Sequence, residues 1–203
     1  MDIAKLLGIK VPLILASQSP RRKKLLTQLG LKFSVHPADI DESKLSIKIT
    51  PAQHVKILSL MKAEYVAGQI HEPAIIIGSD TIVVLENKIL GKPINEKDAE
   101  RMLKLLSGKT HIVYTGIALV NTTTRKNITA VQKTEVTFRK LTIEEIQAYI
   151  RTGSPMDKAG AYGIQDDFGA IFIEHINGCY YNIVGLPLEL LYKTMKKFNN
   201  KST

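Results

Sequence analysis

Near its start the 203-residue chain has an apolar run that passes directly into a helix-start signal. Residues 11–16 are apolar and predict a buried strand. Ser19 followed by Pro20 is typical of a helix N-terminus, because serine caps the first turn and proline needs no N–H there. Apolar residues at helical spacing follow up to Leu29. A strand that turns directly into a helix favours an α/β fold.

The first turn of this predicted helix carries Arg21 and Arg22, although basic residues there oppose the helix dipole. Helix N-termini present amide groups and partial positive charge, and guanidinium groups match phosphate oxygens. The segment 15–22 therefore predicts a cradle for a polyanion, with Ser17 and Arg22 binding phosphate. The alternative interpretation is an ordinary capped helix with a solvated basic first turn.

Composition narrows the class of protein. A hydrophobic content of 44% is enough for a full core, as one domain or two closely joined lobes. The net charge of +9 favours an anionic partner such as a nucleotide, a nucleic acid or an acidic surface. The single cysteine, Cys179, excludes an internal disulfide and a cysteine-rich metal site. The sequence has no signal-peptide core and no apolar run that could cross a bilayer, so we expect a cytoplasmic protein without a membrane partner.

Strand and helix patterns alternate along the chain without a repeat or an interdomain linker, which favours one α/β unit with a mixed sheet. Thr50, Asn95 and Thr142 are predicted helix caps. The predicted strands are 32–36, 110–120, 127–139 and 170–176, the predicted helices 51–68, 96–106, 143–152 and 187–198, and the predicted loops 37–46 and 153–169.

A polar interruption, Gly78-Ser79-Asp80, separates two β-branched runs within residues 73–85. It places a carboxylate inside a ladder that is otherwise buried. Burying a charge without a partner is costly, so Asp80 is expected to meet a metal ion, a lysine or a substrate-bound water. The alternative is a turn aspartate that backbone amides satisfy.

Other charged residues could complete such a site. Glu42, in an acidic loop, could join Asp80 in holding Mg²⁺, although a solvated loop is the simpler interpretation. Lys62 lies among apolar neighbours in a predicted helix, and Lys92 lies between a glycine and a proline. Both are candidates to neutralise phosphate, and both could equally be solvated surface lysines.

The segment 157–165 combines glycines, which allow close backbone approach, with three chemically distinct side chains. Asp157 supplies an auxiliary acid, Lys158 a cation for phosphate, and Gln165 an amide that both donates and accepts, which suits a base edge. The alternative is a polar surface loop. Residues 106–110 resemble the end of a P-loop but lack its earlier glycine, so we expect no kinase or ATPase site there. The five histidines do not have metal-ligand spacing, so we interpret each as structural or solvent-facing.

Taken in order, several motifs resemble those of the Maf family of nucleoside triphosphate pyrophosphatases. The matching segments are 15–22, 78–83, 91–93, 106–111, 157–165 and 182–187, and they span almost the whole chain. The resemblance implies a single domain over residues 1–203 with a mixed, elongated, twisted sheet flanked by helices in two lobes, related to inosine triphosphatases. It also implies a homodimer, a divalent cation such as Mg²⁺ or Mn²⁺, and hydrolysis between the α- and β-phosphates.

The resemblance also assigns roles to residues. Asp80 matches the family's proposed general base, and Arg21, Thr81 and Gln165 match positions linked to substrate choice. The pattern is similar to the dTTP/UTP branch, in which these nucleotides yield a monophosphate and diphosphate. Ser79 departs from the family, since many relatives have alanine there, but one small residue replaces another.

Two other hypotheses remain. A methylated-GTP pyrophosphatase of the same family differs only in its base pocket, and Arg21 and Gln165 argue against it. A non-catalytic nucleic-acid-binding regulator of division would suit the basic charge. However, the sequence has no basic stripe interleaved with aromatic residues and no tryptophan, so no stable nucleic-acid partner is expected.

Overall fold

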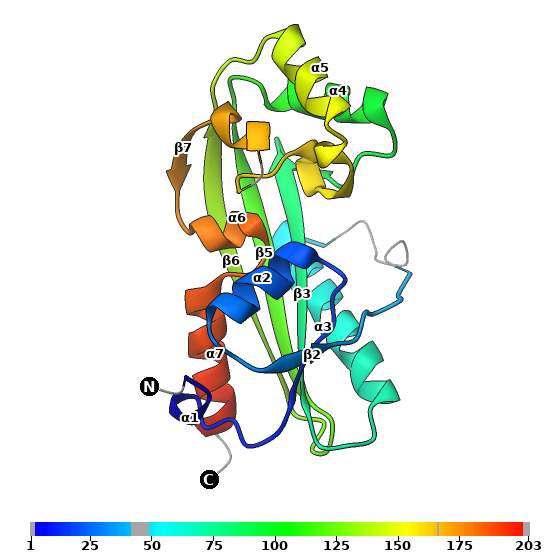
Figure 1. Cartoon of the computed structure of the whole chain (residues 1–203), viewed down its shortest axis with the longest axis vertical. Coiled ribbons are helices and arrows are strands. Elements are labelled where there is room, and N and C mark those ends of the chain that lie inside the picture. Colours follow the sequence, from blue (N-terminus) through cyan, green and yellow to red (C-terminus); the bar gives the residue numbers. More distant parts are fainter. Residues whose placement is uncertain (1–2, 42–48, 166, 201–203) are drawn as a thin grey trace. The chain divides into compact units, whose positions relative to one another are not determined.

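The structure is a computed structural model that describes residues 3–41, 49–165 and 167–200 (Figure 1). The chain divides into two compact units. The first unit comprises Met1–Asp80, Thr115–Gln132 and Gly185–Thr203, and the second comprises Thr81–Tyr114 and Lys133–Val184.

Helices and strands alternate along the chain, as Figure 1 shows. The strands are β1 Leu13–Leu15, β2 Phe33–Val35, β3 Ile75–Leu85, β4 Lys88–Leu90, β5 Thr110–Asn121, β6 Asn127–Phe138 and β7 Ile173–Asn177. The α-helices are α1 Ile3–Leu6, α2 Pro20–Gln28, α3 Pro51–Gln69, α4 Glu96–Leu106, α5 Ile143–Arg151, α6 Tyr180–Val184 and α7 Leu188–Asn200. Short 3-10 helices are η2 Ser154–Asp157, η3 Ala159–Ala161 and η4 Asp167–Phe172.

The described strands form one seven-stranded sheet in the order β2-β1-β3-β5-β6-β7, with β4 paired to β3. β1 is parallel to both β2 and β3, whereas β4 is antiparallel to β3 and β7 is antiparallel to β6. The sheet is therefore mixed, which confirms the predicted mixed α/β fold.

Helix starts follow the predicted capping signals. The Ser19 hydroxyl accepts a hydrogen bond from the Arg22 amide, and Thr50 and Thr142 each form a complete capping box. Asn95 caps α4 by accepting from the Asp98 amide. Among the described residues, no helix is both long and apolar enough to span a membrane.

The prediction that Asp80 lies inside a buried ladder is confirmed, because β3 runs without interruption from Ile75 to Leu85 and Asp80 is buried. Asp80 is consequently a strand residue, and the alternative of a turn aspartate is excluded. The polar side chains can remain in the strand because Lys62 pairs with Asp80 and two backbone carbonyl groups lie within hydrogen-bonding distance of the Ser79 hydroxyl.

The C-terminal third differs more from the prediction. The predicted loop 153–169 contains 3-10 helices, and the last strand begins at Ile173 instead of Ala170. Phe172 is fully buried against the aromatic rings of Phe138 and Tyr149, so it belongs to the core rather than to the strand. The short helices α1 and α6 were not predicted, since pieces of one turn leave little periodicity in a sequence.

Each unit has its own apolar core. In the first unit, residues of α3 pack on the inner strands; this cluster is Ile14, Ala16, Ala63, Val66, Ala67, Ala74, Ile76, Ala118 and Val120. In the second unit, α4 contacts α5 (Figure 1), and their apolar faces meet strand residues. That larger cluster includes Val83, Leu90, Leu103, Leu106, Val113, Phe138, Ile146, Tyr149, Tyr162 and Phe172.

His111 lies fully buried in the core of the second unit. Its Nε2 is 2.7 Å from the hydroxyl of Tyr162, and its ring meets Phe138 edge-on at 5.0 Å between centroids. Burial lowers the pKa of His111 from 6.5 to about 3, because the apolar surroundings disfavour the imidazolium. His111 is therefore neutral in the folded protein at any pH near neutrality.

This depressed pKa predicts acid destabilisation. Between pH 6.5 and about 3 the unfolded chain binds a proton at His111 that the folded chain does not. Its contribution to stability is complete above that window and is lost as the pH falls through it, by up to about 1.4 kcal/mol per pH unit. Urea unfolding across this range should show a steeper pH dependence for the wild type than for His111→Gln. Equal slopes for the two proteins would contradict the assignment.

Candidate functional site

The connections of β1, β2 and β3 create a switch point in the first unit. β1 lies between β2 and β3 in the sheet. The connection through α2 runs from β1 to its neighbour β2, and the connection through α3 runs from β2 past β1 to β3, in the opposite direction. Because parallel crossovers are right-handed, the two connections cover opposite faces of the sheet. Ligands of open α/β sheets bind beyond the carboxyl ends of strands at such a point. Here it lies past Leu15 of β1, which pairs with Ile77 of β3.

Asp80 lies on β3 just beyond this point and is buried, with 6% of its surface exposed. Lys62 of α3 donates a hydrogen bond from Nζ to Asp80 Oδ1 at 2.7 Å. The second oxygen, Oδ2, is buried and has no hydrogen-bond partner among the residues that the structure describes. The lysine thus compensates the charge and fixes the carboxylate, while one oxygen remains an acceptor.

Gly78 explains how α3 brings Lys62 so close to the strand. Residues 78 and 80 face the same side of β3, because side chains alternate along a strand. A Cβ at Gly78 would lie 2.0 Å from the carbonyl oxygen of Ser59 in α3, which no side chain could tolerate. The glycine therefore permits the close approach of helix and strand on which the ion pair depends.

Arg22 is held at the start of α2. Its Nε donates to the carbonyl oxygen of Gly185 at 2.9 Å, and its Nη1 donates to Ser17 Oγ at 3.1 Å. Ser17 Oγ also accepts from the Ser19 amide at 3.2 Å, which ties the turn after β1 to the helix. Arg21, the neighbouring residue, is half-buried. The predicted cradle therefore has Ser17 and Arg22 in direct contact.

The remaining predicted site residues belong to the second unit. Lys92 is exposed, and Lys158 is buried beside Asp157, with 2.9 Å between Lys158 Nζ and Asp157 Oδ1. Lys158 Nζ also donates to the carbonyl and hydroxyl oxygens of Ser154. These contacts stabilise the η2 turn, and phosphate binding by Lys92 and Lys158 stays a prediction.

Thr81 and Gln165 are both half-buried. The segment before Gln165 is anchored by two residues that the sequence analysis missed. Tyr162 is bonded to His111, and the Tyr149 hydroxyl accepts from the Gly163 amide at 3.2 Å. Both tyrosines come from the aromatic core, so the only sequence signal was their aromatic character.

Asp80 offers a carboxylate oxygen suited to a divalent cation. Asp80 Oδ2 is a buried carboxylate oxygen, the hard ligand that Mg²⁺ and Mn²⁺ prefer. Within residues 3–41, 49–165 and 167–200, no group of three or more His, Cys, Asp or Glu side chains could hold a metal. Glu42 lies outside the described residues. Since Mg²⁺ is often bound by one or two carboxylates plus phosphate and water, Asp80 fits that role.

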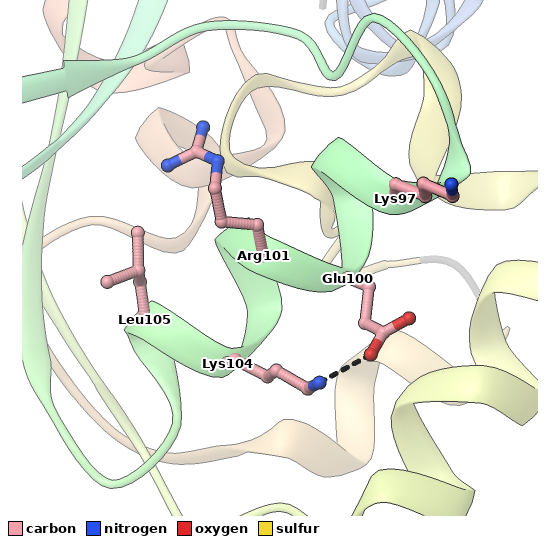
Figure 2. A pocket seen from close by; sticks show the side chains of 5 residues that line it. All are labelled: Lys97, Glu100, Arg101, Lys104 and Leu105. Atoms are coloured by element: carbon pink, nitrogen blue, oxygen red, sulfur yellow. Dashed lines mark ion pairs between the residues drawn. The ribbon is translucent and has the colours of Figure 1, made fainter.

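A surface hollow of about 510 Å³ lies on α4 in the second unit, and Figure 2 shows the side chains that line it. These are Lys97, Glu100, Arg101, Lys104 and Leu105. Lys104 pairs with Glu100 (Figure 2), and Arg101 pairs with Asp98 one turn away. Because these ion pairs connect side chains of a single helix, they stabilise the helix and give the hollow no catalytic group.

Comparisons with known proteins show similar sequences and a similar fold. The family model described as "Maf-like protein" matches residues 12–198. A dTTP/UTP pyrophosphatase of Bacillus cytotoxicus is 49% identical over 92% of this chain and 95% of its own, and one of Bacillus cereus has the same identity and coverage. A HAM1 protein from Coxiella burnetii, 17% identical, aligns with 92% of this chain and 99% of its own at a TM-score of 0.51, which shows the likeness of the folds.

The buried ion pair makes a prediction about stability. Lys62→Met leaves the Asp80 carboxylate buried without its cation and should lower the free energy of unfolding by about 3 kcal/mol. Adding Asp80→Asn should recover part of the loss, because it removes the uncompensated charge. Urea unfolding at neutral pH measures both effects, with Lys24→Met on the exposed surface of α2 as the control. Equal stability of Lys62→Met and Lys24→Met would contradict the interpretation.

Proposed function

The chain belongs to the Maf family, and we propose that it is a nucleoside triphosphate pyrophosphatase acting on dTTP and UTP. The names of its relatives support both the reaction and the substrates. The products are the nucleoside monophosphate and diphosphate.

The observation that carries this proposal is the arrangement of Asp80. Its carboxylate is fixed through Oδ1 by Lys62 and keeps a buried acceptor, Oδ2, at the switch point of the sheet. A held carboxylate with one available oxygen suits a general base for a water molecule. Arg22, at the N-terminus of α2 in the same unit, suits an anionic substrate.

In the proposed reaction a water molecule attacks a phosphorus atom of the α–β bridge. The water oxygen forms the new P–O bond, its proton passes to Asp80 Oδ2, and the bridging P–O bond breaks. The electron pair of that bond leaves with the departing phosphate group. Lys62 keeps the carboxylate oriented throughout, because its bond to Oδ1 does not involve the oxygen that accepts the proton.

Positive side chains offset the negative charge of the substrate. We assign phosphate binding to Ser17, Arg22, Lys62, Lys92 and Lys158, since such preorganised donors stabilise the charge that develops during transfer. Nucleotide pyrophosphatases of this family are generally metal-dependent. In the alternative role of Asp80, its carboxylate would hold Mg²⁺ or Mn²⁺ together with Glu42, and the cation would supply further charge neutralisation and polarise the phosphate oxygens.

Base selection falls to Arg21, Thr81 and Gln165 in this proposal, with Asp157 as an auxiliary acid. An amide side chain can donate to and accept from the edge of a pyrimidine, and Gln165 follows a segment anchored by Tyr149 and Tyr162.

We further propose that the chain acts as a single domain and as a homodimer in the cytoplasm, where nucleoside triphosphates are used, without a stable nucleic-acid partner. The single-domain assignment rests on β3, β5 and β6, each of which contributes residues to both compact units.

A panel of nucleotides tests the proposed activity. We expect hydrolysis of dTTP and UTP with Mg²⁺ or Mn²⁺ to release diphosphate rather than orthophosphate, and to exceed that of ATP, GTP and a methylated GTP. A preference for methylated GTP would favour the other branch of the family. Salt-dependent binding to DNA or RNA without any hydrolysis would favour a non-catalytic regulator instead.

Replacing the proposed base separates chemistry from binding. Asp80→Asn should lower kcat at least about 100-fold, because the amide cannot take a proton from water. Calorimetry with a UTP analogue whose α–β bridge cannot be hydrolysed should show little change in affinity. Glu64→Gln, an exposed carboxylate on α3, is the matched control. Turnover by Asp80→Asn at the rate of this control would overturn the assignment.

A further inference from the structure

Ser79 is a fully buried polar residue of β3 whose side chain faces away from that of Asp80. Its hydroxyl lies 3.1 Å from the carbonyl oxygen of Gly116 and 3.1 Å from that of Gly185. The hydroxyl has a single proton, so both carbonyl groups share one donor. The side chain therefore connects β3 to residue 185, more than a hundred positions along the chain.

Gly185 lies in the short connection between α6 and α7 and has a φ of +114°, a backbone conformation open to glycine and costly for other residues. Its carbonyl oxygen accepts from two sources, Ser79 Oγ at 3.1 Å and Arg22 Nε at 2.9 Å. The direction of this carbonyl group fixes one edge of the Arg22 guanidinium, and Ser17 fixes another.

We propose that Ser79 is a positioning residue for polyphosphate: its hydroxyl holds the Gly185 carbonyl group, which in turn orients Arg22. This inference rests on the proposed binding of phosphate by Arg22. Alanine is similar in size to serine but has no hydroxyl, so Ser79→Ala would remove the hydrogen bond to Gly185.

Loss of the hydroxyl removes the hydrogen bond that connects Gly185 to β3, while the bond from Arg22 Nε to Gly185 remains. Arg22 should then be less well ordered and bind phosphate more weakly. Asp80 and Lys62 lie on the other face of β3, so the chemical step should change little. The expected signature is a change in substrate affinity and KM without a matching change in kcat.

The experiment measures binding of inorganic diphosphate by calorimetry, together with kcat and KM for UTP. Ser79→Ala should raise both the diphosphate Kd and the KM about three- to tenfold, the loss associated with one hydrogen bond. Ser59→Ala is the matched control, because Ser59 is equally buried in the same unit but its hydroxyl donates to the Lys56 carbonyl of its own helix. It should leave both constants unchanged.

A double-mutant cycle distinguishes positioning from general damage. Lysine lacks the Nε donor of arginine, so in an Arg22→Lys background Ser79→Ala should change the diphosphate Kd less than about twofold. The inference would be overturned if Ser79→Ala raised the diphosphate Kd by the same factor in the wild-type and Arg22→Lys backgrounds. An unchanged Kd with Ser79→Ala alone would also overturn it. If the diphosphate Kd values show the expected coupling but the protein hydrolyses no nucleotide, the result would support the inference and contradict the proposed activity.

Discussion

The structure of the first unit depends on the charge of Asp80 in the middle of a buried strand. A carboxylate in that place is tolerated only if a cation reaches it, and the cation comes from a helix on the adjoining face. The helix must therefore lie unusually close to the strand, which requires glycine at position 78. The need to compensate the charge of Asp80 thus sets the distance between α3 and β3, and that distance requires a glycine at position 78.

The alternation of a β-strand divides the roles of neighbouring residues. Asp80 faces Lys62 on α3, while Ser79, the preceding residue, faces the carbonyl group that Arg22 shares. One strand can therefore place a carboxylate on one face and support an arginine on the other. β1 ends before these two residues, because its last residue, Leu15, pairs with Ile77.

Much of the fold could be predicted because its signals are local. The caps at Ser19, Thr50 and Thr142 lie within three or four residues of the groups they satisfy, so the sequence shows both partners. The sequence alone leaves a turn open at Gly78-Ser79-Asp80, since these residues are also typical of turns, and the choice of a continuous strand depends on the packing of α3. The start of β7 likewise depended on Phe172, whose place in the core is decided by distant aromatic rings.

The same difference between local signals and distant contacts applies to the candidate site. Ser17, Arg22 and Asp80 each stand in a local pattern with a chemical meaning, so the sequence predicts them as site residues. The contacts that hold Asp80, Ser79 and Arg22 in place reach 18, 106 and 163 positions along the chain, and no local pattern shows them. By side-chain size alone, serine and alanine are interchangeable at position 79. Size is the wrong criterion at a fully buried position, because a hydroxyl there has partners only if the backbone provides them. Here two carbonyl groups do so, and one of them also holds Arg22, so a small polar residue becomes part of the support of the Arg22 side chain.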